Sequence, residues 1–276
     1  MSISRKKIDK YVYDLVSTYK TRKIDLLDRG LGEKEFFYLN LHKSEYSRTV
    51  YDVVQTIGPG EDKSILEIGA YLGVVSISLS KLNYNVSATE IPEFLSNKRL
   101  QDLYAENNID FSSINLDNGK IPYDDNQFNA VIMCEVLEHL NFNPLPCIQE
   151  VNRILKPGGC FYLAMPNQAS LKRRVQLLFG KSTSHPISCF FEQLSDTENK
   201  IVGIHWREYT VSETKELLTS LGFEIEKTYY TSANLSTNPF KLFLKRMLYK
   251  IFPSLQEGQV CIAKKVKYPA IEFKNL

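Results

Sequence analysis

In the first half of the chain, a glycine-containing turn follows one apolar run, and an acidic residue follows each of the next two. The turn is the segment Glu67-Ile68-Gly69-Ala70-Tyr71-Leu72-Gly73, and Glu90 and Asp117 follow the next two runs. The two glycines of the turn, Gly69 and Gly73, let the backbone turn sharply and approach a ligand closely. The free N–H groups at the start of the helix that follows point at the same place. These residues therefore predict a ligand site at this turn.

The types of these residues indicate which ligand fits. A phosphate-binding turn has Gly-x-Gly-x-x-Gly spacing, whereas this turn has Gly-x-x-x-Gly and an acid that suits an ammonium group better than a phosphate. Glu90 stands where an acid accepts hydrogen bonds from both ribose hydroxyls, and Asp117 can accept one from an exocyclic amine such as adenine N6. Together they indicate S-adenosylmethionine, whose cationic sulfonium favours an acidic cleft. The alternative, that such residues only make turns, is the better interpretation for Glu90 or Asp117 alone.

Histidines are the candidates for acid–base chemistry, because transfer of a methyl group to a hydroxyl usually needs a general base. His139 follows a predicted strand close to the expected methyl group, and His205 lies in a predicted lid. Either is a candidate base, with His139 favoured; the alternative is that His139 caps or packs against the next helix. No positional argument supports His42 or His185.

Short apolar runs alternate with helical patterns from residue 61 onward, which predicts a parallel sheet covered by helices on both faces. The predicted strands are 64–68, 85–89, 110–114, 130–134, 160–165, 222–230 and 259–265. The predicted helices are 4–24, 33–56 (as one or two), 72–82, 92–107, 143–155, 168–179 and 212–221. We expect 180–204 to be irregular. The predicted organisation is an N-terminal helical cap over 1–58, a core over 59–268 with insertions at 180–210 and 231–256, and a tail over 269–276.

The composition excludes several classes of protein. The 276 residues are 43% hydrophobic and 24% charged, and the net charge of +2 argues against binding a polyanion over the whole surface. No window approaches the roughly 18 apolar residues of a spanning helix, and the charged N-terminus is unlike a signal peptide. The five cysteines are scattered without a Cys-x-x-Cys, so we expect no disulfide framework, no metal site and a cytoplasmic location.

The chain resembles the class I S-adenosylmethionine-dependent methyltransferases, strongly over 61–166 and moderately over 200–230. The motifs that carry the resemblance are Glu67–Gly73, Phe128–Leu140, Glu150–Gly159, Met165–Asn167, His205–Thr210 and Leu221–Ile225. The resemblance implies a Rossmann-like, doubly wound α/β fold with an N-terminal helical extension. Its seven-stranded sheet would be mostly parallel with an antiparallel last strand. The His205–Thr210 motif is similar to that of methyltransferases linked to glycan or natural-product modification.

The resemblance also assigns roles to single residues. It implies that Glu67, Gly69 and Gly73 lie along the methionine part of the cofactor, that Glu90 holds the ribose and that Asp117 meets the adenine. Cys134 and Glu135 would face the methionine end and the acceptor. The remaining predicted cofactor contacts are Ala70, Tyr71, Ile91, Leu116 and Arg48, the last as a partner of the cofactor carboxylate or, alternatively, a solvated surface charge.

Two positions depart from the family pattern, and a third pattern is absent. Tyr71 stands where the family usually has a glycine, so the turn would be wider or place a ring against the cofactor. Asn129 replaces an acid that often follows Phe128. Cys134-Glu135 replaces the Asn/Asp-Pro-Pro-Tyr pattern of enzymes that methylate nucleic-acid bases, so we expect no nucleic-acid partner.

The acceptor and its location stay open in the sequence. We expect a small-molecule, glycan or lipid-linked acceptor, methylated more readily at oxygen than at nitrogen or carbon. The segment 238–252 reads as a basic amphipathic helix. Its apolar face either covers the pocket or core, the favoured interpretation, or makes peripheral contact with a membrane. Two alternative functions are a nicotinamide-dependent oxidoreductase and a non-catalytic partner subunit that binds S-adenosylmethionine; the oligomeric state is not predicted.

Overall fold

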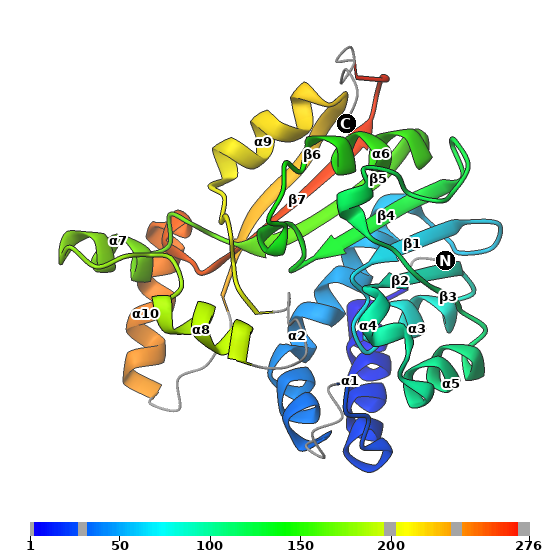
Figure 1. Ribbon diagram of the computed structural model, residues 1–276, viewed down its shortest axis with the longest axis horizontal. Helices are drawn as coiled ribbons and strands as arrows, with labels where there is room; N and C mark the ends of the chain where they lie inside the picture. Colours follow the sequence, from blue (N-terminus) through cyan, green and yellow to red (C-terminus); the bar gives the residue numbers. More distant parts are fainter. Residues whose placement is uncertain (1–2, 27–31, 196–202, 233–238, 270–276) are drawn as a thin grey trace.

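A central sheet organises the computed structural model, which describes residues 3–26, 32–195, 203–232 and 239–269 (Figure 1). The described residues form a seven-stranded sheet in the order β3-β2-β1-β4-β5-β7-β6. The strands are β1 (Ser64–Ile68), β2 (Asn85–Glu90), β3 (Asp110–Ser113), β4 (Phe128–Cys134), β5 (Leu155–Pro166), β6 (Phe223–Thr231) and β7 (Gly258–Lys265). β1 to β5 pair in parallel, and β7 runs antiparallel to both β5 and β6. The predicted α/β fold with an antiparallel last strand is confirmed.

Side chains alternate along each strand and so contribute to two apolar layers, one on each face of the sheet. Ile65 and Ile132 belong to the layer packed against the N-terminal helices, whereas Leu66 and Met133 belong to the opposite layer. The helices are α1 (Arg5–Arg22), α2 (Gly32–Ile57), α3 (Val74–Ser80), α4 (Pro92–Leu95), α5 (Lys98–Glu106), α6 (Leu145–Ile154), α7 (Leu171–Leu178), α8 (Ile187–Ser195), α9 (Val211–Ser220) and α10 (Pro239–Ile251), with short 3-10 turns η1 (Leu116–Asn118), η2 (Leu137–His139) and η3 (Pro253–Leu255).

Three predicted elements differ from the structure. The helix expected over 92–107 is two helices, because the Asn97 side chain accepts the N–H of Leu100 at 3.1 Å and starts α5 afresh. The strand expected over 160–165 begins earlier, at Leu155, which pairs with Phe128. The segment 180–204, expected to be irregular, contains α8, while 196–202 lies outside the described residues.

The two N-terminal helices pack beside the glycine turn and stabilise it. α1 and α2 lie side by side and both pack against α3 (Figure 1). The buried Tyr19 hydroxyl of α1 donates a hydrogen bond to the carbonyl of Leu72, inside the turn itself. The segment predicted as a cap over 1–58 therefore helps to set the conformation of the turn. Its function as a cap over the acceptor stays a prediction.

The second insertion presents its apolar side chains to solvent. In α10, Phe243, Met247 and Ile251 are 59%, 45% and 64% exposed, whereas Tyr249 on the opposite side is buried. The interpretation that this apolar face covers the pocket or core is therefore wrong for the described residues. α7, α8 and α10 extend from the same end of the molecule, at the left of Figure 1. The insertion residues 233–238 and nearly all of the predicted tail, 270–276, lie outside the described residues.

Candidate functional site

The predicted carboxylates meet because the strand register brings their strand ends to one edge of the sheet. Ile68 pairs with Thr89 of β2 and with Met133 of β4, and Glu90 pairs with Ser113 of β3. In such parallel sheets ligands bind beyond the carboxyl ends of the strands, where the strand order reverses. Here that reversal falls between β1 and β4, at the glycine turn.

The turn that follows β1 has a conformation that its two glycines make possible. Gly69 and Gly73 have φ angles of 73° and 71°. A Cβ at Gly69 would lie 2.3 Å from a methyl carbon of Val136, and one at Gly73 would lie 2.9 Å from the ring of Tyr104. The N–H groups of Gly69 and Ala70 both donate to the carbonyl of Thr89, which ties the turn to β2.

Tyr71, where the family usually has glycine, also takes a left-handed conformation, with φ 50°. Its N–H donates to Glu90 at 2.6 Å, and its carbonyl accepts the Tyr104 hydroxyl at 3.2 Å. Its ring lies 5.7 Å from that of Tyr38 and 6.4 Å from that of Phe94, centroid to centroid. Contacts on both sides therefore hold the left-handed backbone, and the ring joins an aromatic group beside the turn.

Glu67 is nearly enclosed and is held from α3. One carboxylate oxygen accepts both the backbone N–H of Ser76, at 2.9 Å, and the Ser76 hydroxyl. Burial raises the pKa of the Glu67 carboxyl to about 8, although the Ser76 hydrogen bonds act in the opposite direction. A cation beside this carboxyl would be favoured, because it would stabilise the ionised form.

Glu90 is buried at the end of β2 and holds two backbone N–H groups. One oxygen accepts the N–H of Tyr71 at 2.6 Å, and the other accepts that of Ile91 at 3.0 Å. Burial raises the pKa of Glu90, with both hydrogen bonds opposing that change. Because each carboxylate oxygen has two acceptor positions, one on each remains for a pair of vicinal hydroxyls.

The other predicted cofactor residues are distributed around the same edge. Leu116 and Asp117 lie in η1, directly after β3, with Asp117 exposed. Cys134 ends β4, and burial raises its thiol pKa well above the usual range. Arg48 of α2 lies within electrostatic reach of Tyr229 on β6. Whether these residues contact the cofactor stays a prediction.

The turn that follows β4 contains the candidate acid–base residues. Glu135 has a left-handed φ of 55°, which is uncommon for a non-glycine residue. The residue as a whole is exposed, but burial of its carboxyl end and the charge of Glu138 raise the pKa of that carboxyl well above the usual range. Glu138 itself is 0% exposed, and burial raises its pKa to about 7.

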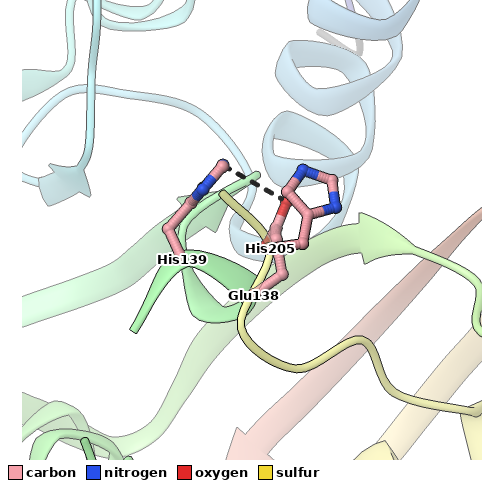
Figure 2. A group of neighbouring side chains, drawn as sticks. All are labelled: Glu138, His139 and His205. Carbon is pink, nitrogen blue, oxygen red and sulfur yellow. Dashed lines mark ion pairs between the residues drawn. The ribbon is translucent and has the colours of Figure 1, made fainter. Parts of the chain in front are cut away.

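His139 and His205 face each other across this turn, with ring centroids 4.8 Å apart. Figure 2 shows both rings beside Glu138, with His139 on η2 and His205 on the segment before α9. That segment is tied down where the N–H of Trp206 donates to the carbonyl of Glu138 at 2.7 Å. The structure therefore brings together the two predicted catalytic histidines, 66 residues apart in sequence.

Each histidine has one ring nitrogen engaged by its surroundings. Nδ1 of His139 lies 3.0 Å from the carbonyl of Ile204, and Nδ1 of His205 lies 2.9 Å from the Glu208 carboxylate. As donors, both Nδ1 atoms leave Nε2 with a lone pair. Burial lowers the pKa of His139, which favours its neutral form. The Arg173 guanidinium in turn donates hydrogen bonds to both carboxylate oxygens of Glu208.

Sequence reasoning did not identify several residues of this site. His185 lies with its ring 5.1 Å from that of His205. His42 pairs with Glu45 on α2, and although burial acts in the opposite direction, the hydrogen bond and charge of Glu45, with a smaller effect of the Glu135 charge, raise the pKa of His42. The spacing of His42 and Glu45 on one helix was the available signal. His185 and His205 also line a cavity of about 170 Å³, together with Gln168, Thr183, Ser184, Trp206, Arg207 and Glu208.

The family follows from a comparison with known domains. A family model described as "Methyltransferase domain" matches residues 42–228. The chain belongs to the methyltransferase domain family. A solved S-adenosylmethionine-dependent methyltransferase from Mesorhizobium loti has the same fold, with a TM-score of 0.55 at 14% identity over 78% of this chain and 97% of that one.

Curated relatives match the chain at low sequence identity. A ubiquinone biosynthesis O-methyltransferase of Hydrogenovibrio crunogenus is 28% identical over 109 residues, which are 39% of this chain and 44% of that protein. An uncharacterised protein of Methanocaldococcus jannaschii is 24% identical over 261 residues, 86% of this chain and 92% of that one. The chain spans less than half the length of the first two curated relatives it matches.

These findings confirm the predicted family, enzyme class and cofactor at the level of the domain: it is an S-adenosylmethionine-dependent methyltransferase domain on a Rossmann-like fold. They give no support to the nicotinamide-dependent alternative. Within the described residues, no helix combines the length and the apolarity that crossing a bilayer requires.

Proposed function

We propose that this methyltransferase transfers the methyl group of S-adenosylmethionine to a hydroxyl oxygen of a lipid-linked acceptor. The observation that carries the oxygen specificity is the pair of His139 and His205 beyond the end of β4, next to the proposed cofactor site. The name of the Hydrogenovibrio relative, a ubiquinone biosynthesis O-methyltransferase, favours the same atom.

In the proposed reaction the acceptor oxygen attacks the methyl carbon in line with the sulfur. The O–CH3 bond forms as the S–CH3 bond breaks, and the electron pair of that bond remains on sulfur, which becomes a neutral thioether. The acceptor proton leaves toward the histidine pair and then to water. Alignment of oxygen, carbon and sulfur supplies most of the catalysis, and effects of orientation reach about 7–11 kcal/mol.

The cofactor seat follows the strand ends. Glu67 would lie beside the cationic methionine end, where a positive charge stabilises its ionised form. Glu90 would accept both ribose hydroxyls on its two free acceptor positions, between the N–H donors of Tyr71 and Ile91. Asp117 in η1 would receive the adenine amine. The Tyr71 ring would flank the adenosine.

The exposed face of α10 supports an acceptor held at a membrane. Phe243, Met247 and Ile251 form an outward apolar stripe, and the exposed Arg246 and Lys250 flank it. Apolar side chains rimmed by cations match the interface of an anionic bilayer. An acceptor with a lipid tail would then present its hydroxyl to the site without leaving the membrane.

Binding and turnover experiments test this function. Calorimetry should show binding of S-adenosylmethionine and S-adenosylhomocysteine and none of NAD. Labelled methyl transfer should then be measured on a phenolic acceptor with an isoprenoid tail, with the matching aromatic amine as the control. Transfer to the amine and not to the hydroxyl would contradict the oxygen specificity. Binding of the cofactor without transfer to either would favour a non-catalytic partner subunit.

A further inference from the structure

Glu138 presents a polar group that the described part of the protein leaves without a hydrogen-bond donor. Its side chain is 0% exposed, and neither carboxylate oxygen has a donor in hydrogen-bond geometry, although the Glu135 carboxyl interacts with it. The nearest cationic candidate is Nε2 of His139, 3.9 Å from one oxygen. Burying a carboxylate without compensation is costly, so such groups are usually paired or bound to a metal ion.

Two imidazole nitrogens converge on the same carboxylate. Ligand atoms of Glu138, His139 and His205 all lie within 4.8 Å of one another (Figure 2). Ligand atoms on one first-row metal ion lie about 2.0–2.2 Å from it, and hence at most about 4.4 Å apart. A side-chain movement of about one ångström would therefore close this group around an ion.

The surroundings orient both histidines as metal sites do. A ligating histidine usually donates its other ring N–H to a carbonyl or a carboxylate. His139 has the carbonyl of Ile204 at 3.0 Å in that position, and His205 has the Glu208 carboxylate at 2.9 Å. Glu208 is itself held by Arg173. Both Nε2 atoms are thus left with their lone pairs for the ion.

We propose that Glu138, His139 and His205 bind a divalent first-row transition ion. Two imidazoles and one carboxylate suit Mn²⁺, Fe²⁺, Co²⁺ or Zn²⁺ better than Ca²⁺ or Mg²⁺. Three protein ligands leave positions open, as in catalytic rather than structural sites. The role of the ion rests on the proposed function: bound near the acceptor hydroxyl, it would lower the pKa of that hydroxyl. Because the ion would hold both histidine lone pairs, the hydroxyl proton would then pass directly to water and not to the histidines.

Cobalt is the probe of choice, because its absorption spectrum reports ligation independently of activity. The purified protein is stripped with EDTA, dialysed and titrated with CoCl2, with calorimetry in parallel. We expect one saturable site per chain and a melting temperature that rises with cobalt. MgCl2 in place of cobalt should bind at least tenfold more weakly. Absence of saturable cobalt binding up to 1 mM would overturn the proposal.

Variants locate the ion. His205→Asn and Glu138→Gln should each abolish saturable binding, while Glu208→Gln should weaken it about 10–100-fold. Glu61→Gln is the control, since Glu61 is an exposed acid outside the site, and its cobalt affinity should stay within twofold of the wild type. Circular dichroism confirms that each variant is folded. Unchanged cobalt affinity in folded Glu138→Gln would overturn the proposal.

The same preparations separate this inference from the proposed function. Cobalt binding without methyl transfer to a hydroxyl would support the ion site and contradict the function. Methyl transfer by EDTA-stripped protein without cobalt binding would support the function and overturn the ion site.

Discussion

At the scale of single residues, Glu90 is the side chain on which the proposed cofactor seat depends most. Glu90→Ala removes the acceptor for both ribose hydroxyls and for the N–H groups of Tyr71 and Ile91. We expect S-adenosylhomocysteine binding, measured by calorimetry, to weaken by about 1–3 kcal/mol. Glu93→Ala, an exposed acid on α4, is the control and should bind normally. An unchanged dissociation constant for Glu90→Ala would show that the ribose is held elsewhere.

Glu67 makes a different prediction, about the pH dependence of stability. Burial raises its pKa in the folded protein to about 8, whereas the unfolded chain titrates near 4.5. The folded state therefore binds the extra proton between these values, and stability falls as pH rises through this window. The glutamine of Glu67→Gln does not titrate, so this variant lacks this pH-dependent loss of stability. The free energy of unfolding of the variant, minus that of the wild type, should therefore increase from pH 5 to pH 8, by at most about 1.4 kcal/mol per pH unit.

The measurement is urea unfolding of cofactor-free protein at pH 5, 6.5 and 8. Glu61→Gln, at an exposed position, should track the wild type throughout. A difference between Glu67→Gln and the wild type that stays constant with pH, or shrinks as pH rises, would contradict the assigned pKa.

At the scale of elements, the turn between β1 and α3 packs tightly against its neighbours, besides forming part of the proposed cofactor seat. Gly73→Ala forces a left-handed φ of 71° on alanine and brings its Cβ to 2.9 Å from the buried Tyr104 ring. The ring is stacked on Phe111, so it has little room to move. We expect a loss of about 2–4 kcal/mol in the free energy of unfolding, from strain and overpacking together.

Gly158→Ala is the matched control for that loss. Gly158 has a φ of 74°, but no atom lies within 4 Å of its Cβ position, so only the backbone strain of about 1–2 kcal/mol applies. Denaturant unfolding of the two variants measures the difference. Equal losses would show that the Tyr104 contact does not constrain the turn.

The elements that could be predicted from sequence are those whose pattern reflects burial. β1 matches its predicted range because Ile65, Leu66 and Ile68 are all buried between covered faces, as in parallel sheets generally. The sequence did not predict α8, because its exposed apolar residues, such as Ile187 and Phe191, do not recur at the spacing of a helix that packs on a core. α10, by contrast, was predicted within 238–252 from its helical periodicity, but the sequence did not show that its apolar stripe faces solvent.

The candidate site was predictable where it follows strand ends, and not where it depends on the path of a loop. The sequence indicates Glu67 and Glu90 because topology alone aligns β1 with β2. It cannot show that residues 203–210 cross the end of β4, since that contact rests on backbone hydrogen bonds to the carbonyl of Glu138. Glu138 therefore carried no sequence signal of its own, although its neighbour His139 did.

At the scale of the whole molecule, the candidate site and the exposed apolar helices occupy different parts. The carboxylates and histidines of the candidate site lie at or beyond the carboxyl ends of the parallel strands, whereas α7, α8 and α10 extend from one end of the molecule (Figure 1). The exposed apolar residues there are Val175, Leu177, Leu178, Phe179, Ile187, Phe191, Phe243, Leu244, Met247, Ile251 and Phe252. So much exposed apolar surface on one side usually marks a contact with a protein or a membrane.

This separation predicts that membrane binding can be removed without disturbing the core. Phe243→Ser with Ile251→Ser replaces two exposed apolar side chains of α10, each worth about 1.5–3 kcal/mol when fully buried in the interface. Sedimentation with phosphatidylserine–phosphatidylcholine vesicles should show at least a tenfold loss of binding, and 0.5 M NaCl should weaken wild-type binding by screening Arg246 and Lys250. Phe37→Ser, equally exposed on α2, is the control and should bind normally. Equal wild-type binding to pure phosphatidylcholine, or full binding by the double variant, would assign this face to a protein partner instead.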